Sequence, residues 1–211
     1  MKTWAAVAAA VLATVPAAAQ EPGRLAERAH QDREIVYFLR DPDTHAFDLY
    51  HDYTETREGM DHYVNVVRQG STVASPSARI LDTGEVLKPE ILKGEAITAA
   101  KVDIGEPVRP DSEIVLIRFP AVARGASVRL RISETYTDPA RYKADGGELV
   151  WDRSFGRPRN AVVLPAGWML TASSIPATIG ETEDGRIRLD FVNPRPDEIA
   201  VLIKAKQRTK K

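Results

Sequence analysis

The stretch Val128-Arg129-Leu130-Arg131-Ile132-Ser133 alternates strictly between apolar and polar residues. Successive side chains of a β-strand point to opposite faces, so a period of two predicts a strand with one buried face and one wet face. The same alternation returns at residues 187–191 and 199–203. The sequence therefore predicts β-structure as the main architecture from residue 34 onward.

Shorter apolar runs between turn signals add further expected strands. These runs lie at residues 34–39, 46–54, 63–67, 96–104, 113–119, 148–153, 161–164 and 168–172. Roughly a dozen short strands with no long amphipathic helix are typical of an all-β protein, and we predict an antiparallel β-sandwich. The alternative is two smaller packed sandwiches joined near residues 105–110, where Gly105, Pro107 and Pro110 mark the best linker candidate.

The first residues have the three-part layout of a secretory signal peptide: Lys2, an apolar run at 5–15 and small residues ending at Ala19. The apolar run is about half of the ~20 residues that span a bilayer, and no later segment approaches that length. We expect cleavage after Ala19 and export to the periplasm or the cell exterior, with no integral membrane segment after cleavage.

Four parts of the chain follow from these patterns. We predict a signal peptide at 1–19, a flexible or short helical leader at 20–33, a β-sandwich module at 34–206 and a basic tail at 207–211. The leader is mostly charged and has few apolar positions. The tail is expected to be a solvated chain end.

The sequence excludes cysteine chemistry and lacks the common motifs of several enzyme classes. The chain contains no cysteine, which rules out disulfides, thiol nucleophiles and cysteine-ligated zinc. Its 29 Lys and Arg residues against 30 Asp and Glu residues do not favour a nucleic-acid partner. The motifs His-Glu-x-x-His and Gly-x-Ser-x-Gly and a phosphate-binding glycine loop are all absent. We therefore expect a non-catalytic module without a cofactor.

The stretch His51 to His62 gathers half of the histidines with four carboxylates. A tight turn at residues 58–59 would make a β-hairpin in which Glu55 faces His62 across the strands. Glu55 and His62 are then the alternative metal ligands, but a pair of ligands makes a weak site. We interpret the stretch as a polar hairpin without metal, and a cross-strand hydrogen bond as the use of this pair.

The segment from Trp151 to Trp168 is the most unusual in the chain. The candidate binding residues are Trp151, Arg153, Arg157, Arg159 and Trp168. Arginine forks recognise carboxylates or phosphates, and an exposed tryptophan offers a stacking surface. The alternative interpretation places both tryptophans in the core and gives the arginines the role of edge charges that discourage aggregation.

Two stretches of the front half resemble the N-terminal β-domain of glycyl aminopeptidase-type metallopeptidases. They are Glu-Ile-Val-Tyr37-Phe-Leu-Arg-Asp-Pro-Asp-Thr44-His45-Ala-Phe47-Asp-Leu49 and Asp82-Thr-Gly-Glu-Val-Leu87. In that family a β-sandwich precedes a helical, zinc-binding catalytic domain. The family's zinc-binding helix is missing from this sequence, so the resemblance implies an accessory sandwich without peptidase activity.

Three functions stay open at the level of the sequence. The preferred one is an exported binding or accessory module whose partner is an unknown protein or glycan. The first alternative is an envelope hydrolase with a polar site near His51 to His62. The second is a structural envelope protein that associates with itself. The fold does not decide between them, because β-sandwiches host many unrelated activities.

Overall fold

The computed structural model describes residues 33–195 and 197–208. The predicted signal peptide, the leader up to residue 32 and the tail from residue 209 lie outside the described residues. Within the described ranges, no helix is both long and apolar enough to cross a membrane.

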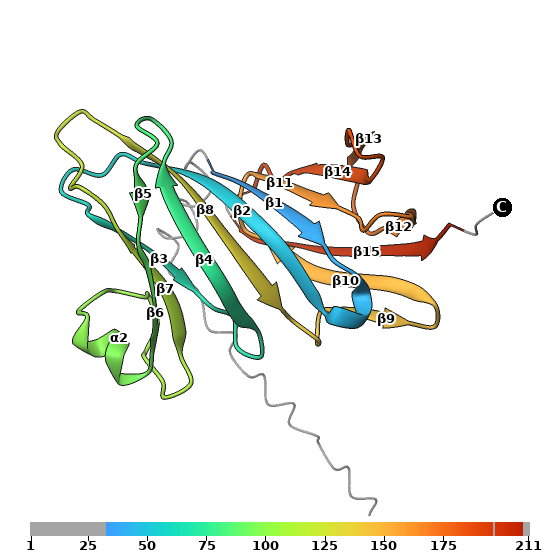
Figure 1. Cartoon of the computed structure of the whole chain (residues 1–211), viewed down its shortest axis with the longest axis horizontal. Coiled ribbons are helices and arrows are strands. Elements are labelled where there is room, and N and C mark those ends of the chain that lie inside the picture. Colours follow the sequence, from blue (N-terminus) through green and yellow to red (C-terminus); the bar gives the residue numbers. More distant parts are fainter. Residues whose placement is uncertain (1–32, 196, 209–211) are drawn as a thin grey trace, which may run out of the picture.

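An eight-stranded sheet is the largest element of the fold (Figure 1). In spatial order its strands are β13 (Thr178–Glu181), β14 (Ile187–Val192), β11 (Arg159–Val163), β1 (Arg33–Leu39), β2 (Ala46–Glu55), β8 (Val128–Thr137), β4 (Thr72–Ile80) and β5 (Val86–Leu87). Neighbouring strands are antiparallel except for β1 and β11, which run parallel.

Two smaller antiparallel sheets complete the β-structure. The four-stranded sheet has the order β12 (Trp168–Ser173), β15 (Ile199–Gln207), β10 (Glu148–Phe155) and β9 (Tyr142–Asp145). The three-stranded sheet has the order β3 (His62–Val66), β7 (Glu113–Arg118) and β6 (Pro89–Lys93). The prediction of an all-β sandwich is confirmed, with three mostly antiparallel sheets.

The main core lies between the large sheet and both smaller sheets. Trp151 of β10 packs edge-on against Tyr37 and Phe47 of the large sheet, with ring centroids 5.2 and 6.5 Å apart. Tyr63 of β3 packs against Tyr53 of β2 at 5.0 Å. Both smaller sheets therefore cover the same face of the large sheet, and one hydrophobic cluster joins all three.

The predicted hairpin between residues 46 and 67 is wrong. β2 is an inner strand whose two edges pair with β1 and β8, while β3 pairs with β7 in the three-stranded sheet. The chain does turn at Gly59, which has φ +79°. The connection at 56–61 then crosses to the other layer, so β2 and β3 meet face to face instead of edge to edge.

The strand predicted at residues 96–104 is also wrong. The structure forms the short helix α2 (Glu95–Ala99) here, and only Ile97 of that helix is buried. Alanine favours helix, and one buried residue in five does not fit the alternate burial of a strand. Residues 105–110 follow α2, and the strands β6 and β7 on either side of this region pair directly with each other. The division into one or two sandwiches stays a prediction.

Candidate functional site

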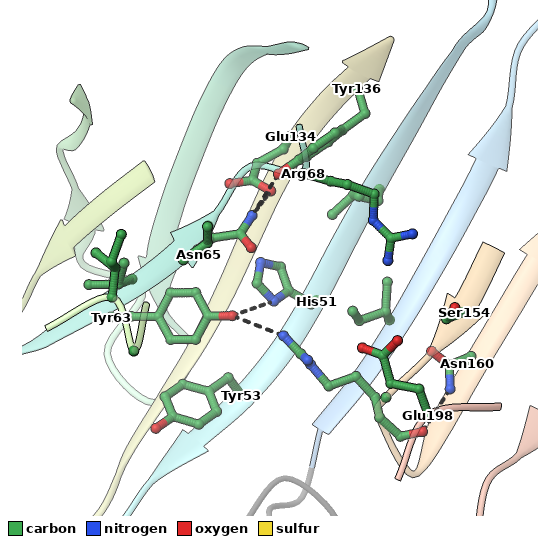
Figure 2. Close-up of a pocket in the computed structure, with 18 of the residues that line it drawn as sticks. His51, Tyr53, Tyr63, Asn65, Arg68, Glu134, Tyr136, Ser154, Asn160 and Glu198 are labelled. Carbon is green, nitrogen blue, oxygen red and sulfur yellow. Dashed lines mark hydrogen bonds between the residues drawn. The ribbon is translucent and has the colours of Figure 1, made fainter. Parts of the chain in front are cut away.

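A pocket of about 860 Å³ lies against the inner face of the large sheet, between the two smaller sheets. Residues of β1, β2 and β8 line its floor. One wall comes from β3 and the loops near it, and the other from the end of β10 and the loop to β11. In Figure 2, Tyr63 and Asn65 lie on one side of His51, and Asn160 and Glu198 lie on the other.

The strand periodicity explains which floor residues face the pocket. In β2, Leu49, His51 and Tyr53 are buried while the residues between them are partly exposed. In β8 the same alternation places Glu134 and Tyr136 on the inner face. Strand positions in phase with core residues thus carry the His51 imidazole and the Glu134 carboxylate at the floor of the pocket.

The hydroxyl of Tyr63 joins the two walls to the floor. His51 Nδ1 lies 3.3 Å from this hydroxyl oxygen. Arg157 donates to the same oxygen from Nη2 at 3.4 Å. A phenol held between an imidazole and a guanidinium can exchange hydrogen bonds with a ligand while staying in a fixed place.

A second polar group centres on Asn65 of β3. Its Nδ2 donates to Glu134 Oε2 at 2.7 Å and to the Tyr136 hydroxyl at 2.9 Å. The other carboxylate oxygen, Glu134 Oε1, is buried and has no hydrogen-bond partner among the described residues. Burial raises the pKa of Glu134 to about 7, although the Asn65 hydrogen bond and the Arg157 charge act in the opposite direction. Burial, then the nearby Glu134 charge, raise the pKa of Tyr136.

Four arginines and Lys101 line the pocket. Arg57 pairs with Glu55, and the other three arginines are Arg68, Arg153 and Arg157. Arg153 Nη1 pairs with Asp138 at 3.1 Å, and its guanidinium lies 4.9 Å from the Phe47 ring centroid. The Nε atoms of Arg153 and Arg157 are buried without an acceptor within the described chain.

Arg68 differs from Arg153 and Arg157 in the contacts of its guanidinium. Its guanidinium has no hydrogen bond or ion pair with any residue that the structure describes. Burial lowers the pKa of Arg68, and the positive charges of Arg153 and Arg141 lower it further, despite the acids Glu198 and Asp138. Arg68 therefore lies in the pocket without a direct carboxylate partner within the described chain, although Glu198 and Asp138 act on it through their charges.

The five binding candidates from the sequence divide into two groups. Arg153 and Arg157 line the pocket. Trp151 is 0% exposed and Trp168 is 8% exposed, which fits the alternative interpretation of both as core residues. Arg159 begins β11, is exposed and does not line the pocket. A stacking surface made from the two tryptophans is thus not present on the outside of this structure.

The predicted facing of Glu55 and His62 is wrong, since the two residues lie on strands of different sheets. Glu55 accepts hydrogen bonds from Arg57 Nε at 3.0 Å, from Arg57 Nη2 at 2.7 Å and from the Tyr53 hydroxyl. His62 Nδ1 contacts Asp61 at 2.6 Å. Across residues 33–195 and 197–208, no three side chains of metal-binding type gather where they could hold an ion.

Sequence reasoning missed four residues that make the pocket polar: Asn65, Arg68, Glu134 and Glu198. The sequence did carry a signal for Glu134, because this residue continues the alternate, inward-facing positions of Leu130 and Ile132. A carboxylate at a position that the alternation assigns to the core is an informative exception. The other three residues have no comparable signal, since their approach depends on how the three sheets are assembled.

Comparison with solved structures finds partial matches to this chain. A variant of the M1 zinc metallopeptidase from Deinococcus radiodurans matches 82% of this chain at 13% identity with a TM-score of 0.46. The unsubstituted enzyme gives the same coverage and identity with a TM-score of 0.45. An aminopeptidase N family protein from Idiomarina loihiensis matches 81% of the chain at 12% identity with a TM-score of 0.43.

This chain spans only a part of those proteins: 41% of each Deinococcus chain and 29% of the Idiomarina chain. No protein-family model and no curated protein matches the sequence. The resemblance predicted from residues 34–49 and 82–87 is confirmed as a partial structural likeness to M1 metallopeptidases.

Proposed function

We propose that this protein is a binding module that takes a small anionic molecule into the pocket between its sheets. The volume of about 860 Å³ lies within the ~300–1,000 Å³ that is usual for small-molecule sites. The observation that carries the proposal is the gathering of Arg68, Arg153 and Arg157 in one pocket. The Arg68 guanidinium has no hydrogen bond or ion pair within the described chain.

A carboxylate or phosphate group would give the Arg68 guanidinium a direct partner. Charge-assisted hydrogen bonds to arginine contribute roughly 1.5–3 kcal/mol each, and a planar guanidinium can offer two of them to one anionic group. The Nε atoms of Arg153 and Arg157 are donors still available for such bonds. The Tyr63 hydroxyl, already held by Arg157, adds a neutral hydrogen-bonding group to the same pocket.

The proposal retains a non-catalytic role and export to the periplasm or exterior, and it replaces the protein or glycan partner with a small molecule. The hydrolase alternative uses the same space, because His51 and His62 both line the pocket. A binding role needs only the hydrogen bonds and charges described, whereas hydrolysis also needs an activated nucleophile or water.

Titration calorimetry on the chain from Gln20 tests this proposal with acetate, succinate and inorganic phosphate as probes. We expect at least one probe to bind, and Arg68→Gln to weaken that binding about 10-fold or more, as loss of one charged contact predicts. Arg68→Gln should still fold, since no hydrogen bond or ion pair within the described chain involves this side chain.

The matched control is Arg129→Gln, an exposed arginine that pairs with Asp82 at 2.6 Å and does not line the pocket. Its affinity for the probes should equal that of the unchanged protein. An equal loss in both variants would overturn the proposal, and so would the absence of binding by all three probes together with the carboxylic and amino acids of the next subsection.

A further inference from the structure

Glu134 is a buried acid at the floor of the pocket, whose lining also includes the acids Asp103 and Glu198. It belongs to β8, pairs in register with Leu49 of β2 and is only 3% exposed. Asn65 satisfies Oε2, but Oε1 has no donor anywhere in the described chain. An ionised carboxylate that is buried with a free oxygen is costly, so this position favours a ligand that brings a donor.

Neighbouring groups do not supply that donor. Asn65 Nδ2 also donates to the Tyr136 hydroxyl, so its two hydrogen bonds, to Glu134 Oε2 and to Tyr136, both lie within this cluster. Arg157 acts on Glu134 through its charge, while its Nη2 donates to Tyr63. The pocket thus has a buried carboxylate oxygen without a donor at Glu134 and a group of arginines elsewhere in its lining.

This polarity selects among the possible ligands. A simple anion gains contacts with the arginines but leaves Glu134 Oε1 without a partner. A simple cation meets the positive charge of Arg68, Arg153 and Arg157. A molecule with an anionic group and a protonated amine satisfies both ends, and the ammonium group brings three donors where one is missing.

We propose that the natural ligand is an amino-bearing acid, with its anionic group on the arginine side and its ammonium group on Glu134. This assignment rests on the proposed function, because it uses the same pocket and adds a second contact point. It identifies Glu134 as the residue that distinguishes an amino acid from the corresponding acid without an amine.

Matched probe pairs test the assignment by calorimetry. β-Alanine is compared with propionate, 4-aminobutyrate with butyrate and 5-aminopentanoate with pentanoate, so that each pair differs only by the amine. We expect at least one amino-bearing member to bind about 10-fold or more tightly than its partner, as a charged hydrogen bond predicts. Glu134→Gln should abolish that difference and leave the affinity for the plain carboxylate within about 3-fold.

The pH dependence provides a second readout on the unchanged protein. Because the pKa of Glu134 is raised to about 7, the free pocket holds a proton there below neutral pH. An ammonium group must displace this proton, so affinity for the amino-bearing probe should rise from pH 6 to pH 8 with proton release. His51, Tyr63, Tyr136 and Arg157 also face this region, and all four remain in Glu134→Gln. The dependence should therefore disappear in that variant.

The outcomes separate the two proposals. Equal affinities within every pair would overturn the amino-bearing ligand and leave the anionic pocket standing. Failure of all these probes, together with acetate, succinate and phosphate, would overturn the proposed function and this assignment with it. If Glu134→Gln does not fold, the absence of proton release by the unchanged protein would still contradict the assignment.

Discussion

Glu55 and Glu134 are both almost fully buried, yet their surroundings move their pKa values in opposite directions. Burial alone raises the pKa of each carboxyl. At Glu55, hydrogen bonds from Arg57 and Tyr53 outweigh burial and lower the pKa to about 2. At Glu134, one amide donor does not outweigh burial, and the pKa rises to about 7. The number of donors around each carboxylate thus separates a structural acid from one that is free to meet a ligand.

We predict that Glu55→Gln destabilises the protein by about 2 kcal/mol at pH 7, the usual size of a charged hydrogen bond contribution. The folded-state pKa lies below the ordinary value of 4.5, so this stabilisation is present above pH 4.5 and is lost as pH falls towards 2. Urea unfolding at several pH values should show the difference from the unchanged protein shrinking in that window. The exposed Glu58→Gln should have little effect, and a constant difference down to pH 3 would contradict the prediction.

At the scale of the elements, the alternation of apolar and polar residues predicted which side chains point inward better than it predicted which strands pair. The pattern at 46–54 correctly predicts that His51 and Tyr53 point inward, as their burial shows. It does not reveal that β3 joins β7, because edge pairing depends on which strands already occupy the edges of β2. The same limit applies to the site. Arg153 and Arg157 were found from their segment, whereas Asn65 and Arg68 reach the pocket only through the sheet assembly.

The connection from β6 into α2 depends on Gly94. This residue has φ +47°, and a Cβ atom placed on it would lie 3.0 Å from the carbonyl oxygen of Pro110. We predict that Gly94→Ala destabilises the protein by about 3 kcal/mol, since it combines backbone strain with a clash against main chain. Gly146→Ala is the control, because its φ is +59° but nothing lies within 4 Å. It should lose about 1 kcal/mol, and equal losses in urea unfolding would count against the role given to Gly94.

Across the whole molecule, one hydrophobic cluster draws residues from all three sheets. It includes Val115 and Ile117 of the three-stranded sheet, Trp151 and Val201 of the four-stranded sheet, and Phe47 of the large sheet. A continuous core of this kind favours cooperative unfolding. Tyr37 and Leu49, which line the pocket, belong to the same cluster.

We therefore predict a single unfolding transition for the chain from Gln20 without added ligand. Trp151 and Trp168 both lie in the four-stranded sheet, so tryptophan fluorescence reports that sheet. Far-ultraviolet circular dichroism reports all strands. The two urea transitions should share one midpoint and one slope. Separate midpoints would instead support two sandwiches that unfold independently.

Because β11 is made long after β1, the edge of β1 that pairs with it stays unpaired during much of synthesis. β1 carries Ile35, Val36, Tyr37 and Phe38, and its far neighbour in the sheet comes only after ten strands have been made. Until residues 159–163 arrive, this apolar strand is an open edge, the kind of edge that recruits other chains. A nascent chain that stops before Arg159 should therefore aggregate. A chaperone would have to cover the open edge of β1 until β11 has been made.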